Sequence, residues 1–185
     1  MRIVFTRFPL ESAFGGAEVQ TIALMKGLRE HGHAVSFLGS CPVLLDLCRE
    51  YKIDNEELII GDPPVTKWGA ISFAWRQFGM RKKLKSQISN LKPDSIFMVS
   101  LSEKLLLTNT NAKVVWIEHD RVGRWLQKNP WLPRLKMLSS GVTTVVVSNL
   151  SKEIYDKMGW RNVIAIPNGV HPPKGDRYLP THLPT

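Results

Sequence analysis

Seven short apolar runs recur along this chain, and segments of helical length separate most of them. The runs cover residues 3–5, 35–38, 58–60, 96–99, 114–117, 144–147 and 163–166. Strands that are apolar along most of their length are typical of a parallel sheet whose two faces are both covered by helices. The pattern therefore predicts an α/β fold with a doubly wound, mainly parallel, Rossmann-like sheet.

The segments between these runs show helical periodicity. Between 17 and 31, one stripe is formed by Ala17, Thr21, Leu24, Met25 and Leu28. Gly32 follows as a natural helix stop. Further helices are expected at 43–51, 69–91, 131–139 and 151–158.

The size of the chain indicates one domain. Its 185 residues, of which 43% are hydrophobic, are enough for one substantial core but too few for two ordinary α/β domains. We assign residues 1–170 to this domain. Four prolines occur among few apolar residues in 171–185, which indicates a Pro-rich tail or a truncated interdomain linker.

Positive charge is concentrated in two acid-free blocks, one between Asp62 and Asp94 and the other from Arg121 to Lys152. The net charge is +9, and no acidic residue occurs between Asp62 and Asp94. The densest basic cluster in that interval consists of Arg81, Lys82, Lys83 and Lys85. Such a block attracts phosphates, anionic lipid or nucleic acid. Nucleic acid is not expected as a partner, because no recognised reader motif accompanies the charge.

The helix expected around this cluster has two interpretations. Trp68, Phe73, Trp75 and Phe78 precede the basic residues, and aromatic rings beside lysines suit a lipid headgroup region. Alternatively, Ile71, Trp75 and Phe78 are spaced by four and three residues and form the buried stripe of a helix. The lysines would then belong to a solvated face.

Several features favour the cytoplasm. The N-terminal apolar stretch is short and is interrupted by Arg7 and Pro9, unlike a signal peptide, and no stretch reaches the roughly 20 apolar residues of a membrane span. Cys41 and Cys48 lie seven positions apart in a segment expected to be helical, about two turns apart along the axis, so no disulfide is expected between them. Reduced thiols agree with a cytoplasmic location.

Two adjacent glycines, Gly15 and Gly16, precede the first long helix. Glycines at a helix N-terminus let backbone N–H groups approach a phosphate closely. A tight turn followed by Glu18 in the first helical turn would explain the same residues. The spacing matches neither Gly-x-Gly-x-x-Gly nor Gly-x-x-x-x-Gly-Lys-Ser/Thr, which disfavours a dinucleotide site and a P-loop.

Polar residues follow the later apolar runs, at the sheet edge where α/β proteins bind ligands. Glu118, His119 and Asp120 follow the fifth run. His119 could bind a phosphate or a sugar hydroxyl, could take a proton near neutral pH, or could be a structural hydrogen-bonding group.

The sixth and seventh runs end in similar corners. After the sixth run, Ser148 or Ser151 could cap the next helix, and Asn149 could point into the crevice. After the seventh run comes Pro167-Asn168-Gly169-Val170, an ordinary turn signal when taken alone.

In their order along the chain, these elements resemble the N-terminal domain of the family 4 glycosyltransferases, which are retaining enzymes of the GT-B fold. The resemblance extends from residue 1 to about residue 170. It implies that a sugar is transferred from a nucleotide sugar to an acceptor glycan or lipid in a cleft between two domains. The second, donor-binding domain is absent from this chain, so the resemblance implies a separate donor-binding domain or subunit and little activity of the chain alone.

The resemblance also implies roles for individual residues. Gly15 and Gly16 would contact the donor diphosphate, and His119, followed by Asp120, would be the catalytic part of the site. The cleft would also contain Glu18, Ser148, Asn149, Asn168 and Gly169. No metal and no other cofactor is expected. One departure is His171, which takes the place of the aspartate that usually follows Asn-Gly-Val in the family.

Many family 4 enzymes use lipid-linked acceptors. The resemblance therefore adds a peripheral site on the inner face of the membrane, with Arg81, Lys82, Lys83 and Lys85 facing anionic lipid. Two other interpretations stay open. The chain could be a non-catalytic subunit that binds an acceptor or a lipid, or it could be a free-standing Rossmann-like binding module.

Overall fold

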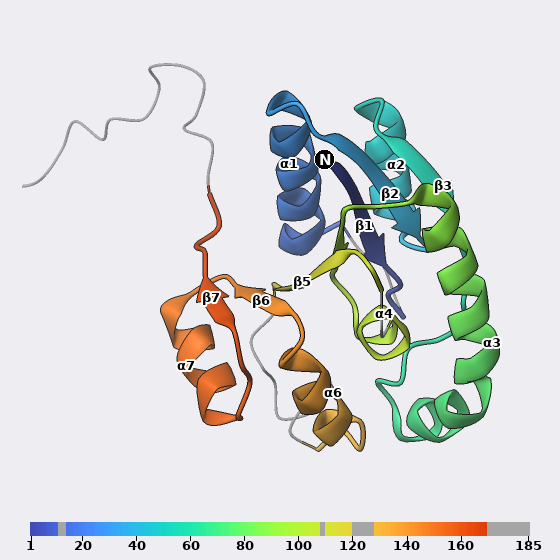
Figure 1. Cartoon of the computed structure of the whole chain (residues 1–185), viewed down its shortest axis with the longest axis vertical. Coiled ribbons are helices and arrows are strands. Elements are labelled where there is room, and N and C mark those ends of the chain that lie inside the picture. Colours follow the sequence, from blue (N-terminus) through green and yellow to red (C-terminus); the bar gives the residue numbers. More distant parts are fainter. Residues whose placement is uncertain (11–13, 108–109, 120–127, 170–185) are drawn as a thin grey trace, which may run out of the picture.

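The computed structural model describes residues 1–10, 14–107, 110–119 and 128–169. Its centre is a seven-stranded sheet in the order β3-β2-β1-β4-β5-β6-β7, in which every neighbouring pair is parallel (Figure 1). The strands are β1 (Arg2–Arg7), β2 (Ala34–Gly39), β3 (Asp54–Glu57), β4 (Ser95–Met98), β5 (Lys113–Glu118), β6 (Thr143–Val146) and β7 (Val163–Ala165). The strand order reverses beside β1, which confirms the predicted doubly wound, Rossmann-like sheet.

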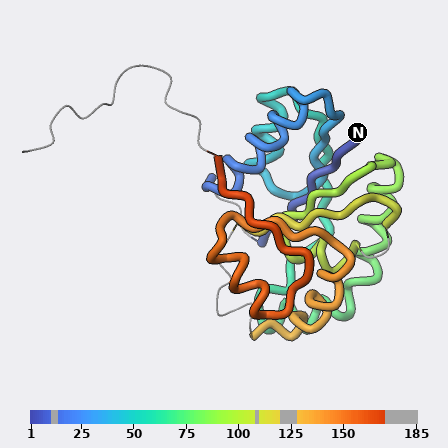
Figure 2. The backbone as a smooth tube through the Cα atoms, turned by 60° about the vertical axis from the view of Figure 1, so that its left-hand side comes forward, coloured from blue at the N-terminus to red at the C-terminus, as the bar shows by residue number. Residues whose placement is uncertain are grey.

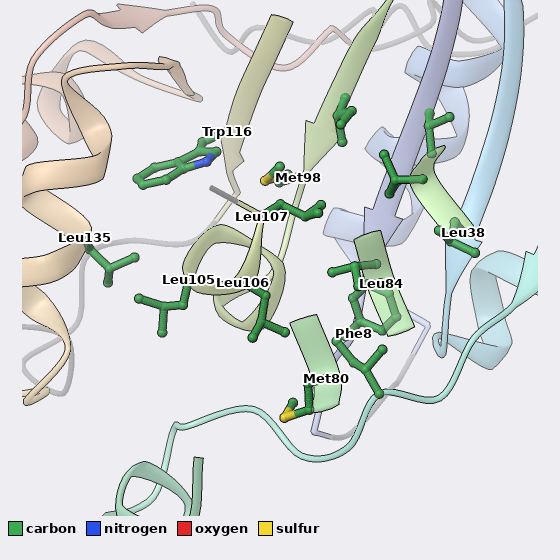
Figure 3. Packing of buried hydrophobic residues seen from close by; sticks show 14 of the residues in the cluster. Phe8, Leu38, Met80, Leu84, Met98, Leu105, Leu106, Leu107, Trp116 and Leu135 are labelled. Atoms are coloured by element: carbon green, nitrogen blue, oxygen red, sulfur yellow. The ribbon is translucent and has the colours of Figure 1, made fainter. Parts of the chain in front are cut away.

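Helices cover both faces of this sheet. They are α1 (Gly16–Glu30), α2 (Pro42–Glu50), α3 (Lys67–Leu91), α4 (Leu101–Leu106), α6 (Leu132–Ser139) and α7 (Asn149–Lys157). Successive residues of a strand point to opposite faces, so Phe5 packs with Met25 of α1 and Leu44 of α2, whereas Val4 belongs to the other core. That second core joins side chains of α3, α4 and α6, among them Leu84, Leu105 and Leu135 (Figure 3).

The third strand lies earlier than the apolar run at 58–60 predicted. β3 is Asp54–Glu57, and three of its four residues are exposed. It is at the edge of the sheet and pairs only with β2, so polar side chains are tolerated there. Leu58 and Ile60, from the predicted run, are buried just after the strand and pack in the core under α3.

The buried faces of two helices also differ from expectation. On α1, Thr21 and Met25 are buried as predicted, but Leu24 is 40% exposed and Ile22 is buried. On α3, one of the two interpretations, the buried stripe of Ile71, Trp75 and Phe78, is wrong, because all three side chains are exposed. The residues that α3 buries are Ala70, Phe73, Met80, Leu84 and Ile88. The helical spacing of Ile71, Trp75 and Phe78 is real, but a different stripe of α3 faces the sheet.

Cys41 and Cys48 are buried and form no disulfide with each other, as expected. No helix in the part of the chain that the structure describes is long and apolar enough to cross a bilayer.

The short helix α4 was not predicted, and a buried carboxylate holds its start. Oε1 of Glu103 accepts hydrogen bonds from the backbone N–H groups of Ser100, at 2.6 Å, and Val99, at 3.1 Å. The side chain is fully buried, and burial raises the pKa of Glu103 from 4.5 to about 7, although these hydrogen bonds and Lys104 oppose the shift. The charged form of Glu103 is therefore disfavoured in the folded protein.

We predict that the free energy of unfolding falls as the pH rises from about 4.5 to about 7, because the folded state holds the Glu103 proton more tightly than the unfolded state. Glu103→Gln keeps the accepting oxygen and removes the charge. It should stabilise the protein at pH 8 by on the order of 1 to 3 kcal/mol, with a smaller effect at pH 5. Urea denaturation at both pH values measures this, with the exposed Glu153→Gln as control. Equal pH slopes for Glu103→Gln and the wild type would contradict the prediction.

Candidate functional site

Helix α1 begins with two glycines whose presence the local backbone does not require. Gly15 is the N-cap residue with φ of −145°, and Gly16 is the first helical residue. A Cβ atom on Gly16 would meet nothing within 4 Å, and one on Gly15 would lie 3.3 Å from Oε2 of Glu18. Because Gly15 has no side chain, it cannot cap the first-turn N–H groups of α1. These groups and the helix dipole make this end of α1 a place where an anion can bind.

Glu18 is turned towards β1. Its side chain is 4% exposed and forms an ion pair with Arg7, the last residue of β1. This pair ties the first turn of α1 to the end of the strand, on the far side of the connecting loop. The placement differs from that of a carboxylate facing an open cleft. Removing either partner would leave a buried charge without its counterion, which is costly.

His119 follows β5 directly and contacts α1. Its Nε2 lies 3.2 Å from Oγ1 of Thr21, and that hydroxyl donates its proton to the carbonyl oxygen of Ala17 at 2.7 Å. The hydroxyl oxygen therefore accepts from His119, so Nε2 carries a proton. Thr21 is five residues after Gly16, or about 7 to 8 Å along the helix axis. The imidazole is thus held beside α1 a short distance from its glycine end.

The neighbouring Glu118 is held by a lysine from α4. Nζ of Lys104 donates to Oε1 of Glu118 at 2.7 Å and to the carbonyl oxygen of Ile117 at 3.4 Å. The Lys104 side chain is only 4% exposed. This contact anchors the end of β5 immediately before His119. Asp120, the other half of the proposed catalytic pair, lies outside the described residues.

The corners after β6 and β7 lie at the same edge of the sheet. Oγ of Ser148 accepts from the backbone N–H of Ser151 at 3.1 Å, so Ser148 is the one of the two candidate serines that caps α7. Asn149 is the first residue of α7 and is exposed. Because β6 is the parallel neighbour of β5, this corner is next to the one that holds His119.

The segment after β7 reaches α1. Asn168 and Gly169 are exposed, and the carbonyl oxygen of Gly169 accepts a hydrogen bond from Nε2 of Gln20 at 3.1 Å. The segment, red in Figure 2, accordingly runs up to the blue helix. The structure thus brings residues 15–21, His119 and Gly169 together at the carboxyl edge of the sheet.

Four residues of this neighbourhood were not predicted from the sequence: Arg7, Gln20, Thr21 as a partner of His119, and Lys104. Arg7 and Lys104 lie within or beside apolar segments, and nothing in those segments indicates that the two residues pair with Glu18 and Glu118. The Ser-x-x-Glu pattern at 100–103 could have revealed the start of α4, because it is typical of a capping box.

The basic cluster belongs to a different surface. Arg81, Lys82, Lys83 and Lys85 lie on α3, which covers the opposite face of the sheet from α1. Nζ of Lys83 donates to the carbonyl oxygen of Ile59 at 2.8 Å. Within the described ranges, no three His, Cys, Asp or Glu side chains are grouped so that they could hold a metal ion.

Solved structures share this fold. A glycosyltransferase from Rickettsia africae ESF-5 has a TM-score of 0.67 and 18% identity, and the match covers 91% of this chain and 43% of that one. The glycosyltransferase SnogD from Streptomyces nogalater has a TM-score of 0.58 and 15% identity, and the match covers 98% of this chain and 53% of SnogD. The UDP-GlcNAc 2-epimerase from Neisseria meningitidis has a TM-score of 0.59 and 14% identity, and the match covers 89% of this chain and 46% of the epimerase. The chain therefore spans about half the length of these proteins, as one Rossmann-like domain of the GT-B type.

No curated protein matches this chain. The sequence model described as Glycosyltransferase Family 4 matches residues 14–173, which include the glycine pair, His119 and the Pro-Asn-Gly-Val segment. Since this match covers most of the sequence, the chain belongs to glycosyltransferase family 4.

Proposed function

We propose that this chain is the acceptor-side half of a retaining glycosyltransferase, which moves a sugar from a nucleotide sugar to an acceptor glycan or lipid. The observation that carries the proposal is the position of His119, which Thr21 holds beside the glycine end of α1. An anion-binding helix end and a hydrogen-bonding imidazole are then close enough to serve the two ends of one sugar diphosphate.

The proposed chemistry breaks the bond between the anomeric carbon and the diphosphate, and forms a bond from that carbon to an acceptor hydroxyl oxygen. The acceptor hydroxyl gives its proton to an oxygen of the leaving diphosphate, and the diphosphate leaves with the bonding electrons. N–H groups of α1 at Gly15 and Gly16 would stabilise the growing charge on the diphosphate, and His119 would contact the transferred sugar. Such stabilisation by a helix N-terminus is why we propose a reaction without a metal ion or another cofactor.

The donor would be held mainly by a second domain, carried on a longer chain or on a separate subunit. Support comes from the coverage of the related structures, of which this chain spans about half. The epimerase structure from Neisseria meningitidis is described as bound to UDP-GlcNAc, which makes a nucleotide sugar a reasonable donor class for this fold.

We also propose that the enzyme works in the cytoplasm, at the inner face of a membrane. Support comes from the basic residues of α3, an element that contains no acidic residue. Arg81, Lys82, Lys83 and Lys85 would meet anionic headgroups, and a lipid-linked acceptor would be presented at the same surface.

The first prediction from this proposed function concerns His119. In an enzyme completed with a donor-binding domain, His119→Ala should lower kcat on the order of a hundredfold or more, because a positioned polar group near the reacting carbon is lost. His31→Ala, at the other end of α1, is the control. Turnover close to that of the wild type, in a folded variant, would remove His119 from the mechanism.

The second prediction separates the ligand role of Gly16 from a structural one. Gly16→Ala creates no clash within the protein, so the melting temperature should not fall, but the added methyl group would obstruct a diphosphate. We expect kcat/KM for the donor to fall by about tenfold or more in the completed enzyme. Gly27→Ala, in the same helix and equally free of clashes, should leave kcat/KM unchanged. If both variants behave alike, the diphosphate does not contact Gly16.

The third prediction concerns the chain alone. A few exposed hydrogen bonds contribute roughly 0.5 to 1.5 kcal/mol each, which is too little to offset the immobilisation of a nucleotide sugar. Calorimetric titration with UDP- and GDP-sugars should therefore give a Kd no tighter than about 1 mM, and no transfer. Micromolar binding or turnover would show that the donor needs no second domain. If the chain binds the nucleotide sugar weakly and still shows no turnover after a donor-binding domain is added, the result would favour a non-catalytic subunit.

A further inference from the structure

Helix α3 has two apolar faces, and only one of them packs against the sheet. The outward face carries four large side chains, with exposed fractions of 81% for Trp68, 58% for Ile71, 85% for Trp75 and 79% for Phe78. Their spacing of three, four and three residues places them in one row along the helix. We call these four residues the outer row. Their exposure follows from the helix geometry, because Ala70, Phe73 and Met80 occupy the opposite side.

The outer row is part of a larger apolar surface. Trp68, Ile71 and Trp75 line a shallow hollow of about 550 Å³ together with Leu10 and Pro63, which lie in the loops after β1 and β3. Leu10 is itself 49% exposed. Contiguous exposed apolar surface of this kind marks an interaction site, because it is costly to keep in water.

Basic side chains flank the outer row. The exposed Lys67 precedes Trp68, and the exposed Lys82 follows Phe78 by one helical turn, with Lys85 three residues later. Lys83 is engaged with the carbonyl oxygen of Ile59 and contributes less to the outward face. No acidic residue occurs anywhere in α3. Asp62 lines the hollow, but Lys67, Lys82 and Lys85 outnumber it. The surface therefore combines aromatic rings with an excess of positive charge.

We propose that the outer row inserts into the headgroup region of a phospholipid bilayer that contains anionic lipid, with Lys67, Lys82 and Lys85 on lipid phosphates. Tryptophan rings are amphipathic and favour this region, and lysines can keep their ammonium groups at the phosphates while their stems follow the apolar surface. A second copy of the chain fits less well, since it would bring two acid-free, basic helices together.

The position of α3 relates this surface to the site. The helix begins after β3, so its Trp68 end lies at the carboxyl edge of the sheet, where α1 begins and β5 ends (Figure 1). A bilayer docked there would present headgroups beside that edge. This last step rests on the proposed transferase function, and the docking itself extends the membrane location proposed with it.

The test uses the whole chain with vesicles of phosphatidylcholine and phosphatidylglycerol in a 3:1 ratio. Trp68 and Trp75 should shift their fluorescence to shorter wavelength on binding, and brominated lipids should quench it, because the other described tryptophans are at least partly buried. Trp68→Ser with Trp75→Ser should weaken binding in co-sedimentation by about tenfold or more, as interfacial burial of both rings is lost. Met137→Ser, an exposed apolar residue on α6, should bind as the wild type does.

The charge is tested separately. Lys82→Gln with Lys85→Gln should weaken binding by roughly fivefold per lysine at low salt, with less effect at high salt. Lys113→Gln with Lys157→Gln, two exposed lysines on other elements, is the matched control and should change little. All these positions except Lys85 are exposed, so circular dichroism should show an unchanged fold.

Three results would overturn the proposal: no vesicle binding by the wild type, unchanged binding by the double tryptophan variant, or a dimer that the tryptophan changes dissociate. Transfer to a water-soluble acceptor separates this proposal from the transferase function. The tryptophan variant should retain that activity in the completed enzyme. If vesicle binding behaves as described while the completed enzyme transfers no sugar, the docking surface stands and the proposed function fails.

Discussion

The parallel pairing of β1 with both β2 and β4 is the constraint on which the rest of the structure depends. Every strand of the sheet runs in the same direction, so all carboxyl ends meet at one edge. Beside β1, the chain leaves towards β2 on one side and returns to β4 on the other. As a result, α1 and α2 cover one face of the sheet, and α3, α4 and α6 cover the other. The loop after β1 lies at this reversal, which is where open α/β sheets bind ligands.

Two largely buried ion pairs position the loops at that edge. Arg7, at the end of β1, holds Glu18 in the first turn of α1, and Lys104 of α4 holds Glu118 at the end of β5. Buried ion pairs contribute little net stability, but breaking one is costly, so they restrict the alternatives open to a loop. Here they flank the contact between Thr21 and His119 and restrict where the imidazole can lie relative to Gly15 and Gly16.

The exposed face of α3 shows a second consequence of the same architecture. Because α3 packs with one stripe on the sheet, its aromatic stripe has to face outward. A helix that is apolar on both sides leaves one apolar face in water, which costs free energy. Contact with a membrane or a partner would offset that cost. The proposed site at the carboxyl edge and this face lie on different elements, so substitutions can alter one without altering the other.

Sequence alone determined the fold class, six of the seven strands and most of the long helices, because apolar runs and helical periodicity report burial directly. It also indicated Gly15, Gly16 and His119 as candidate site residues and a serine cap at Ser148 or Ser151, since strand ends and caps are local features. Tertiary structure decided what those features contact. The Thr21 hydroxyl, 98 residues from His119, the Arg7–Glu18 pair and the outward direction of Trp68 and Trp75 depend on packing between distant segments, which no local pattern encodes. The edge strand β3 escaped prediction for the related reason that a strand with one neighbour needs no apolar sequence.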